Sequence, residues 1–434
     1  MAGSDDLDVA PFIREFSSGS RRLGESNPTK TEFIDNLDVA PFVRGSTTND
    51  VSRSSDNYDT LIWRAVGQGI SSSQLDRLAV SSKVVSIAPH SFNSALAVWS
   101  GKFSLAPVGL ILAGALAAKN EGGSEDSCPL VILRSRGDGN VSLLGAVSDG
   151  VGGAGSSTTT VNEGGLLTER TQAFVASRLV RRTLAEQFLA GRSLDAQTVH
   201  SSISQSLEEY KSRYLDEDPV ALRGSMIKTL PATLASFHCL IDRSNRGGFV
   251  RLSTTWAGDS RIYVMSPISG LAQATRDDVG VEDTFEQLMC DPPTTNVLNA
   301  SGPFDVNRSS IQIDTPFLAI AATDGLFGYL PTPGALELLL IQELQAARDV
   351  DDFARSLAIR VSRMTADDAS YVVAMIGFGE RINSVAHQFS KRYQVLEERY
   401  GGRSPEELLN VDETERERLW VIEKASYSRF LMAK

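Results

Sequence analysis

The sequence is poor in the residues that usually carry nucleophilic catalysis or soft-metal chemistry. Among its 434 residues there are only four histidines and three cysteines. Cys128, Cys239 and Cys290 are widely separated and form no CxxC pair, which argues against a disulfide framework. They indicate three reduced thiols, at least partly buried, in a cytosolic protein. With so few candidates, catalysis by a histidine- or cysteine-based nucleophile is not expected.

Concentrated positive charge and long apolar runs are also missing. The formal net charge is −12 and there is no dense Lys/Arg patch, so nothing favours binding to nucleic acid or to an acidic membrane surface. The longest uncharged run, Phe103 to Ala118, has 16 residues including Pro107, fewer than the roughly 20 that a membrane helix needs. It predicts a buried strand or strand pair. The N-terminus, MAGSDDLDV, is acidic and polar and carries no secretory signal, so a cytoplasmic protein is expected.

A short apolar motif occurs twice within an otherwise polar N-terminal segment. Residues 1–82 are rich in serine, and we expect them to form a largely disordered tail. Within this tail, LDVAPFIR at Leu7–Arg14 recurs as LDVAPFVR at Leu37–Arg44. Proline pre-extends the backbone, phenylalanine supplies an anchor and arginine a charge, so we interpret the copies as tethered docking peptides for a protein partner. That partner could be the catalytic domain itself. A harmless duplication, or a strand pair folded onto the domain, remains the alternative.

Between residues 83 and 380, apolar strand-like runs alternate with amphipathic helices. Phe317–Ala322 is fully apolar, as in strands buried within a sandwich, and helices are predicted from about Thr168 to Ala190 and from Pro333 onward. Two groups of strands with paired helices predict an α+β fold, a sandwich of sheets flanked by helices. Residues 381–434 are more charged and are predicted to form a C-terminal helical extension.

Four acidic motifs lie at the edges of the apolar runs, with a fifth between them. They are Glu125-Asp126 in GGSEDS, Asp149-Gly150 in AVSDGVGG, Asp324-Gly325 in AIAATDGLF and Asp367-Asp368 in ADDASYVVA, with Asp259 of WAGDSR between the second and the third. A single Asp-Gly pair is typical of a turn. Strand ends, however, are rigid and can hold several like charges together, which is unfavourable unless cations neutralise them. Because oxygen ligands without nearby His or Cys favour hard cations, the set predicts magnesium or manganese.

In their order and spacing, the motifs SEDS, AVSDGVGG, WAGDSRIY, AATDGLFGYL and DDASYVV make residues 83–380 resemble the metal-dependent type-2C (PPM) protein phosphatases. The resemblance implies a four-layer α-β-β-α sandwich of two antiparallel sheets flanked by helices. It also implies hydrolysis of phosphoserine or phosphothreonine by direct attack of a water that two Mg²⁺ or Mn²⁺ ions activate.

The resemblance assigns one group of residues to the first half of this metal centre. Asp149 matches the carboxylate that bridges both ions, and Gly150 matches the residue that lends a backbone carbonyl. Glu125 matches an acidic ligand of one ion, with Asp126 beside it as a supporting acid.

A second group of residues completes the implied centre. Asp324 and Asp367 match the ligands of the other ion, while Asp259 matches a position associated in bacterial relatives with a third, weaker metal. Asp368 falls where the family often has asparagine and is given a secondary role. Asp149, Asp324 and Asp367 are therefore the expected catalytic carboxylates.

Two departures from the family pattern concern the phosphate. Many members place an arginine shortly before the first acidic motif, whereas this chain has Lys119, a point charge without the bidentate fork of arginine. Lys119 is the candidate to bind the phosphate as a point charge, and Arg134 or Arg136 is the alternative phosphate-binding residue. Val151 stands where some relatives have a histidine that is proposed to donate a proton.

These observations leave three hypotheses. The first is a cytoplasmic Ser/Thr protein phosphatase that opposes a kinase. The second is an adaptor with the phosphatase fold and negligible turnover that binds phosphoproteins or a kinase, which the missing arginine and the docking-like tail favour. The third, an unrelated all-carboxylate metal hydrolase, is disfavoured by the GDSR motif.

Overall fold

The computed structural model describes residues 84–87, 96–105, 108–119, 124–135, 140–163, 166–215, 228–241, 248–281, 287 and 292–431. The predicted tail with its duplicated motif lies outside the described residues, as do Arg136 and Cys290. Cys128 and Cys239 are buried thiols, in keeping with the expectation from the sequence. None of the helices in the described ranges combines the length and the apolar character that a bilayer-spanning helix requires.

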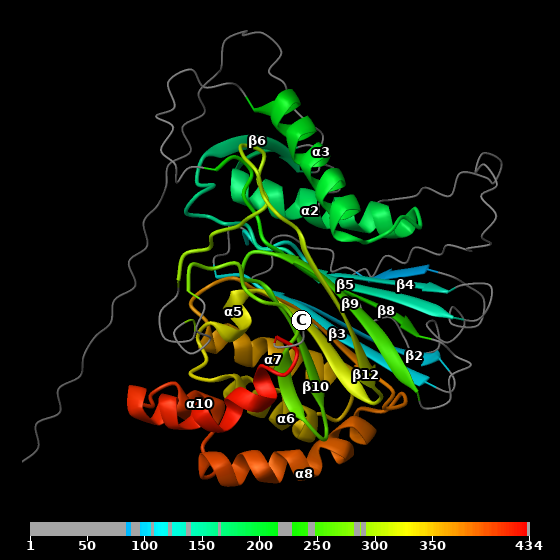
Figure 1. Ribbon diagram of the computed structural model, residues 1–434, viewed down its shortest axis with the longest axis vertical. Helices are drawn as coiled ribbons and strands as arrows, with labels where there is room; N and C mark the ends of the chain where they lie inside the picture. Colours follow the sequence, from blue (N-terminus) through cyan, green and yellow to red (C-terminus); the bar gives the residue numbers. More distant parts are fainter. Residues whose placement is uncertain are drawn as a thin grey trace, which may run out of the picture.

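Two antiparallel sheets, each with six strands among the described residues, form the centre of the molecule (Figure 1). The strand order is β1-β4-β5-β8-β9-β12 in the first sheet and β11-β10-β13-β14-β3-β2 in the second. The first sheet consists of β1 (Val84–Ile87), β4 (Leu130–Ser135), β5 (Val141–Val147), β8 (Leu234–Ile241), β9 (Phe249–Ala257) and β12 (Asn307–Asp314). The second consists of β2 (Leu96–Leu105), β3 (Val108–Ala117), β10 (Arg261–Ser266), β11 (Gly270–Gln273), β13 (Phe317–Ala322) and β14 (Ala369–Ile376).

An apolar core fills the space between the two sheets, and strand β3 shows how the sequence produces it. Leu110 and Leu112 belong to the core between the sheets, whereas Ile111 and Ala113 belong to the cluster beneath the helices on the other side. Because successive side chains of a strand point to opposite faces, a strand that is covered on both faces must be apolar throughout. The long uncharged run of the sequence therefore forms β3 and part of its partner β2, and the predicted strand pair is confirmed.

Helices cover the outer face of each sheet. On the first sheet lie α2 (Gln172–Leu189) and α3 (Ala196–Tyr214), and on the second lie α6 (Pro333–Ala346) and α7 (Val350–Met364), with the single turn α5 (Asp324–Phe327) at the end of β13 (Figure 1). Proline at the first position of α6 costs no hydrogen bond, because the first helical N–H groups have no partner within the helix. The predicted α+β sandwich of two antiparallel sheets flanked by helices is confirmed.

A hairpin occupies the start of the segment that was predicted to be helical from about Thr168. Strand β6 (Thr158–Glu163) pairs with β7 (Leu166–Thr171), and α2 begins only at Gln172. The hairpin is rich in threonine, whose branched side chain favours extended backbone. Thr171 caps the helix by accepting a hydrogen bond of 3.1 Å from the N–H of Phe174. The predicted start of this helix was therefore wrong.

The C-terminal helices pack on the helical layer of the second sheet rather than standing apart from it. They are α8 (Ile382–Tyr400), α9 (Pro405–Leu408) and α10 (Glu413–Tyr427). A capping box between Ser404 and Glu407 begins α9, and Gly401 ends α8 with a φ of 62° that favours glycine. Phe389, Leu419 and other residues of these helices share one hydrophobic cluster with α6 and α7.

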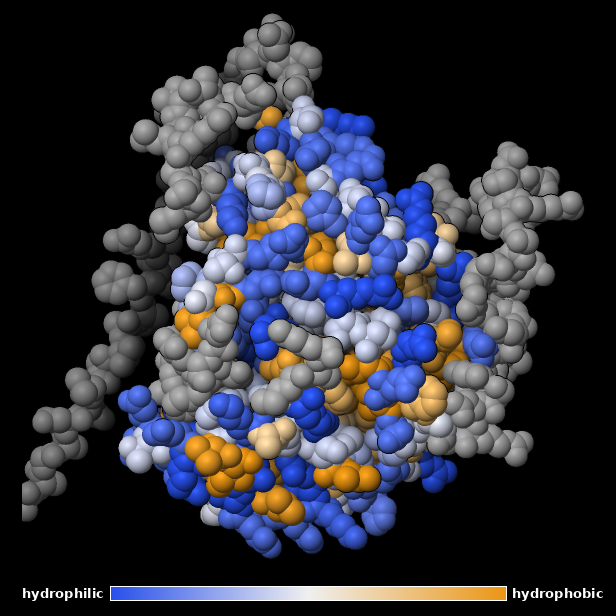
Figure 2. Space-filling view, in the orientation of Figure 1, coloured by the Kyte–Doolittle hydropathy of each residue, from blue (hydrophilic) through white to orange (hydrophobic). Residues whose placement is uncertain are grey.

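The surface mixes hydrophilic residues with scattered hydrophobic ones (Figure 2). Small apolar groups lie over α8 and α10, where Val395, Val421 and Ile422 are exposed. Scattered apolar residues of this kind are normal on a protein surface and identify no site by themselves.

Candidate active site

In the first sheet, strand pairing brings two acidic motifs to the same edge. Strand β5 ends at Val147, two residues before Asp149, and strand β9 ends at Ala257, two residues before Asp259. Both strand ends pair with the start of β8, which lies between them. The antiparallel register therefore places the two aspartates at one end of the sheet.

In the second sheet, strand pairing places Asp324 and Asp367 at the same edge. Arg261, the first residue of β10, pairs with Ala322, which is the last residue of β13 before Asp324. Ala322 also pairs with Tyr371, near the start of β14 and shortly after Asp367. Carboxylates from motifs more than 200 residues apart in sequence thus meet at one edge of the sandwich.

The carboxyl groups at this edge interact electrostatically, as their pKa values show. Burial, together with the nearby charges of Asp368 and Asp324, raises the pKa of Asp126 to about 7. Burial also raises the pKa of Asp149 well above its ordinary value, with contributions from Asp126 and Asp324. For Asp259, burial and then the charge of Asp324 raise the pKa to about 8. Desolvation and like charge both disfavour the ionised form, and such shifts mark this cluster as a candidate functional site.

Asp126 is the most deeply buried of these acids. Its Oδ2 accepts a hydrogen bond of 2.8 Å from the hydroxyl of Thr323, which itself accepts one of 2.8 Å from the N–H of Ser370. The other oxygen, Oδ1, is buried and forms no hydrogen bond within the described part of the chain, although the carboxyl of Asp149 lies nearby. A buried carboxylate oxygen in this state is costly unless a proton or a cation satisfies it.

Glu125 is held at both its side chain and its backbone. Its Oε1 accepts a hydrogen bond of 2.7 Å from the hydroxyl of Thr171, and its backbone carbonyl accepts one of 2.6 Å from the hydroxyl of Ser177. The fully buried guanidinium of Arg178 donates to the carbonyl of Ser124 at 3.0 Å. Burial raises the pKa of Glu125. No sequence pattern indicated Thr171, Ser177 or Arg178, because Ser177 and Arg178 bind backbone atoms and Thr171 lies in a hairpin that was predicted to be helix.

Two glycines of the motifs are required by close backbone approach. A Cβ on Gly150 would lie 2.4 Å from the carbonyl oxygen of Ala173, and one on Gly325 would lie 1.9 Å from that of Asp368. The backbone N–H of Asp149, next to Gly150, donates to the hydroxyl of Thr233 at 3.2 Å. The Asp-Gly pairs therefore allow the acidic loops to pack directly against neighbouring elements.

Asp368 holds two loops together. Its Oδ1 accepts the N–H of Lys119 at 2.7 Å and its Oδ2 accepts the N–H of Glu125 at 2.8 Å. Asp367 is exposed and accepts the N–H of Asp368 at 2.8 Å. Asp368 thus binds backbone N–H groups. Lys119 contacts Asp368 through its main chain, and the side chain of Lys119 is exposed.

Arg134 does not reach the site, contrary to one alternative from the sequence. Its guanidinium is buried and donates a hydrogen bond of 3.0 Å to the carbonyl of Phe188 at the end of α2. In strand β4 it pairs with Ser142, near the opposite end of β5 from Asp149. Of the basic residues that were proposed to bind phosphate, Lys119 alone both lies beside the acidic edge and falls within the described residues.

The donor set suits a hard divalent ion, although it does not yet enclose one. In the described part of the chain, no three or more Asp, Glu, His or Cys side chains are already arranged to hold a metal. The groups that converge are oxygen donors with raised pKa values, and one buried oxygen of Asp126 lacks a hydrogen bond. Oxygen donors of this kind are the ligands that Mg²⁺ and Mn²⁺ prefer.

Comparison with known proteins gives matches in structure only. No family model matches the sequence, and no curated protein does. The catalytic domain of the serine threonine protein phosphatase PstP in complex with two manganese ions is 20% identical, with a TM-score of 0.39, over 62% of this chain and 99% of that chain. In structure, the chain is similar to PPM Ser/Thr phosphatases.

Two further solved structures give the same picture. The serine/threonine phosphatase PstP/Ppp of Mycobacterium tuberculosis is 16% identical with a TM-score of 0.38, over 64% of this chain and 97% of that chain. The PPM Ser-Thr phosphatase MsPP from Mycobacterium smegmatis, in complex with cacodylate, is 16% identical with a TM-score of 0.37, over 66% of this chain and 99% of that chain. At such low identities and TM-scores, the function has to be argued from the site itself.

Proposed function

We propose that the protein is a Mg²⁺- or Mn²⁺-dependent phosphatase that hydrolyses phosphoserine or phosphothreonine in protein substrates. The observation that supports this most directly is the meeting of Asp126, Asp149, Asp259 and Asp324 at one edge of the sandwich, where burial and the neighbouring carboxylates raise the pKa values of the first three. Structural carboxylates gain nothing from such an arrangement, whereas ligands of a shared cation require it.

Each predicted ligand has a place in this proposal. Asp149, the carboxylate that the resemblance assigns to both ions, would hold them together with Glu125, the carbonyl of Gly150, Asp324 and Asp367. When bound, the ions would lower the pKa of a shared water and offset negative charge on the phosphate. A third ion at Asp259 is part of the same proposal.

The surrounding residues of the chain would hold these ligands in place. The hydroxyl of Thr171 orients the carboxylate of Glu125, and the hydroxyl of Thr323 orients that of Asp126. Asp368 fixes the backbone on both sides of the segment between Lys119 and Glu125. Hydrogen bonds of this kind fix the direction of ligand oxygens, and their loss commonly weakens metal binding.

The test is hydrolysis of p-nitrophenyl phosphate and of a phosphothreonine peptide, with Mn²⁺ or Mg²⁺ added and with EDTA. We expect metal-dependent turnover that Asp149→Ala abolishes. Asp314→Ala, which removes an exposed aspartate in β12, serves as the control and should leave turnover unchanged. Equal activity in EDTA, or full activity in Asp149→Ala, would refute the proposal.

A second candidate function is an adaptor that binds phosphoproteins or a kinase with negligible turnover. It is favoured by the described residues that were candidates to bind phosphate: Lys119 lacks the fork of arginine, and Arg134 is engaged away from the site, at the end of α2. Phosphopeptide binding by a wild-type protein that remains inactive in both metals would support this candidate over the enzyme.

The N-terminal motifs belong to the proposal as docking peptides for a protein partner in the cytoplasm. Changing Phe12 and Phe42 to Ala removes both anchors and should weaken partner recruitment without altering turnover of p-nitrophenyl phosphate. Unchanged co-purification of partners with the double variant would count against docking.

A further inference from the structure

Tyr427, the last residue of helix α10, belongs to a buried polar network within the sandwich. The hydroxyl of Tyr427 donates a hydrogen bond of 2.6 Å to Oε1 of Gln273, at the end of β11. The amide nitrogen of Gln273 in turn donates one of 2.8 Å to Oδ1 of Asp277. All three side chains are buried, so each polar atom depends on these partners rather than on water.

Arg261 closes this network into a ring. Its guanidinium forms an ion pair with Asp277, with 2.6 Å between NH2 and Oδ2, and its Nε donates to both carboxylate oxygens. Its remaining nitrogen, NH1, donates to the hydroxyl of Tyr263 at 3.2 Å and to that of Tyr427 at 3.4 Å. A buried ion pair of this kind is favourable only when further hydrogen bonds satisfy its remaining donors. Tyr427 supplies one of them from a helix more than 150 residues away in sequence.

The ring lies directly behind two of the acidic motifs. Arg261 is two residues after Asp259, and its guanidinium carbon stands 4.1 Å from the centre of the Phe327 ring. Phe327 is the last residue of the short helix α5, whose first residue is Asp324. A single guanidinium thus contacts the elements that carry both aspartates, and it is a favourable cation–π partner for the aromatic ring.

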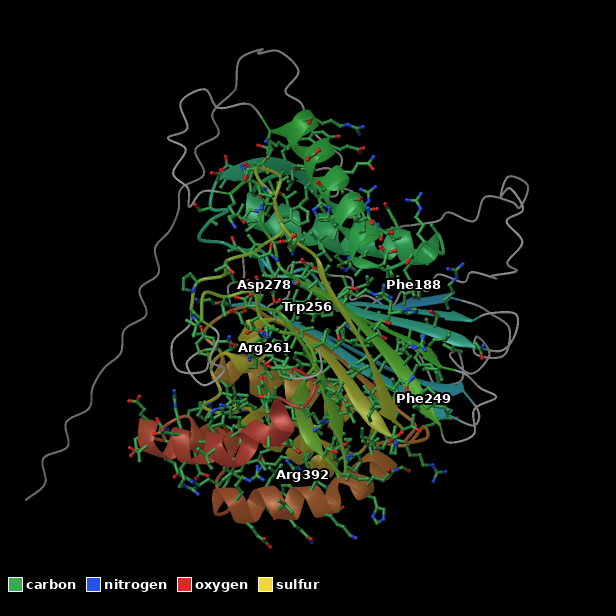
Figure 3. The ribbon with its side chains drawn as sticks, viewed as in Figure 1. Phe188, Phe249, Trp256, Arg261, Asp278 and Arg392 are labelled. Carbon is green, nitrogen blue, oxygen red and sulfur yellow. The ribbon has the colours of Figure 1, made fainter. Side chains whose placement is uncertain are left out.

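The residue after Asp277 holds the other side of the same loop. Asp278 accepts the N–H of Gly258 at 3.0 Å through Oδ2, and its own N–H donates to the carbonyl of Gly258 at 3.0 Å. Figure 3 shows Arg261 between α10 and the segment around Asp278. The loop that carries Asp259 is therefore fixed before it by Asp278 and after it by the Arg261–Asp277 pair.

We propose that Tyr427 is a positioning residue for the acidic edge, through which the C-terminal helices set the placement of Asp259 and Asp324. Its hydroxyl fixes the Arg261–Asp277 pair, and that pair fixes the Asp259 loop and helix α5. The consequence for metal binding rests on the proposed function, whereas the mechanical link does not. The C-terminal helices are on this view part of the catalytic unit.

The chain offers a matched control for the test. Tyr400, in α8, is also fully buried and also donates its hydroxyl to a buried acceptor, Oε1 of Glu423. Glu423 in turn accepts the N–H of Gly334, at the start of α6. Tyr400→Phe and Tyr427→Phe therefore remove the same atom from the same extension, and only the second removes it from the Arg261 ring.

The experiment measures backbone hydrogen exchange by mass spectrometry in the full chain, without metal and at a pH where both variants are folded. We expect Tyr427→Phe to speed exchange in peptides that cover residues 258–262 and 324–328, and Tyr400→Phe to leave those peptides at the wild-type rate. A second readout is the Mn²⁺ concentration that gives half of the metal-induced rise in Tm. It should rise about 10-fold in Tyr427→Phe, the size of effect seen when a supporting partner of a ligand is lost.

The inference is overturned if exchange at these two segments is unchanged in Tyr427→Phe, or if Tyr400→Phe speeds it equally. A purely local role of the hydroxyl would change exchange only around residues 424–430. If the wild-type protein neither binds Mn²⁺ nor hydrolyses phosphate esters, the proposed function fails, and the exchange data still decide whether Tyr427 positions the acidic edge.

Discussion

The acidic edge and the interface of α6 with α7 and the C-terminal helix α8 both bury carboxylates, but they surround them with opposite charges. At the interface, Glu337 lies 2.5 Å from Arg392, and Glu343 lies 2.8 Å from Arg360. At the edge, Asp126 and Asp149 instead face further carboxylates that raise their pKa values. A buried charge that is part of a stable structure is normally paired with a charge of the opposite sign. The contrast therefore separates buried acids that are paired with a cation of the protein from buried acids that face one another, as the proposed metal site requires.

The largest effect is expected where a buried pair at the interface is broken. Arg392→Met leaves the carboxylate of Glu337 buried without its cation, which typically costs about 3–5 kcal/mol of unfolding free energy. Urea denaturation monitored by circular dichroism measures this. Arg348→Met, which breaks an exposed pair with Asp352, is the control and should cause no comparable loss. Equal losses in the two variants would mean that burial does not set the value of these pairs.

At the acidic edge, removing a charge should increase the free energy of unfolding instead of lowering it. Asp126→Asn keeps an acceptor for the hydroxyl of Thr323 and offers an N–H₂ group to the carboxyl of Asp149. Because the folded protein holds the pKa of Asp126 at about 7, the metal-free variant should be more stable than wild type at pH 8. Urea denaturation in EDTA measures the difference, and Glu337→Gln is the matched change at the interface, where destabilisation is expected. A destabilised Asp126→Asn would contradict the interpretation of the edge.

The same shift predicts how stability depends on pH. In the unfolded chain an aspartate loses its proton near pH 4, whereas folded Asp126 and Asp259 hold theirs until about 7 and about 8. Between these values the folded state binds more protons than the unfolded state, so metal-free stability falls as the pH rises from about 4 to about 8. Tm measured against pH in EDTA should show this decline, and saturating Mn²⁺ should reduce it. A metal-free Tm that rises over this range would show that other groups dominate.

The parts of the molecule that could be predicted from the sequence are those encoded by local patterns. Strand β3 and the position of Asp324 after an apolar run follow from one stretch of chain each. The contact between Tyr427 and Gln273 joins residues 154 positions apart, and no local pattern encodes it. Arg178 could not be recognised either, since its acceptors include the carbonyls of Ser124 and Phe174, and every residue has a carbonyl. Sequence therefore predicted the acidic groups better than the residues that hold them.

The smallest predicted effect compares two adjacent glycines beside Glu125. A Cβ on Gly152 would lie 1.9 Å from Oε2 of Glu125, whereas one on Gly153 would meet no atom within 4 Å. The carboxylate of Glu125 is the end of a flexible side chain, so Gly152→Ala should displace it at little cost in stability. Displacement would nonetheless remove a predicted ligand from its oriented position and raise the Mn²⁺ concentration for half-maximal turnover by about 10-fold.

Gly153→Ala is the control for this change, because it adds the same methyl group to the same loop without touching the carboxylate. Both variants should have a metal-free Tm close to that of wild type, and only Gly152→Ala should need more Mn²⁺. Identical metal dependence in the two variants would mean that Glu125 can leave its observed position without consequence. The acidic edge would then depend on Asp126 and Asp149, whose carboxyl groups face one another, rather than on the acid that Thr171 holds.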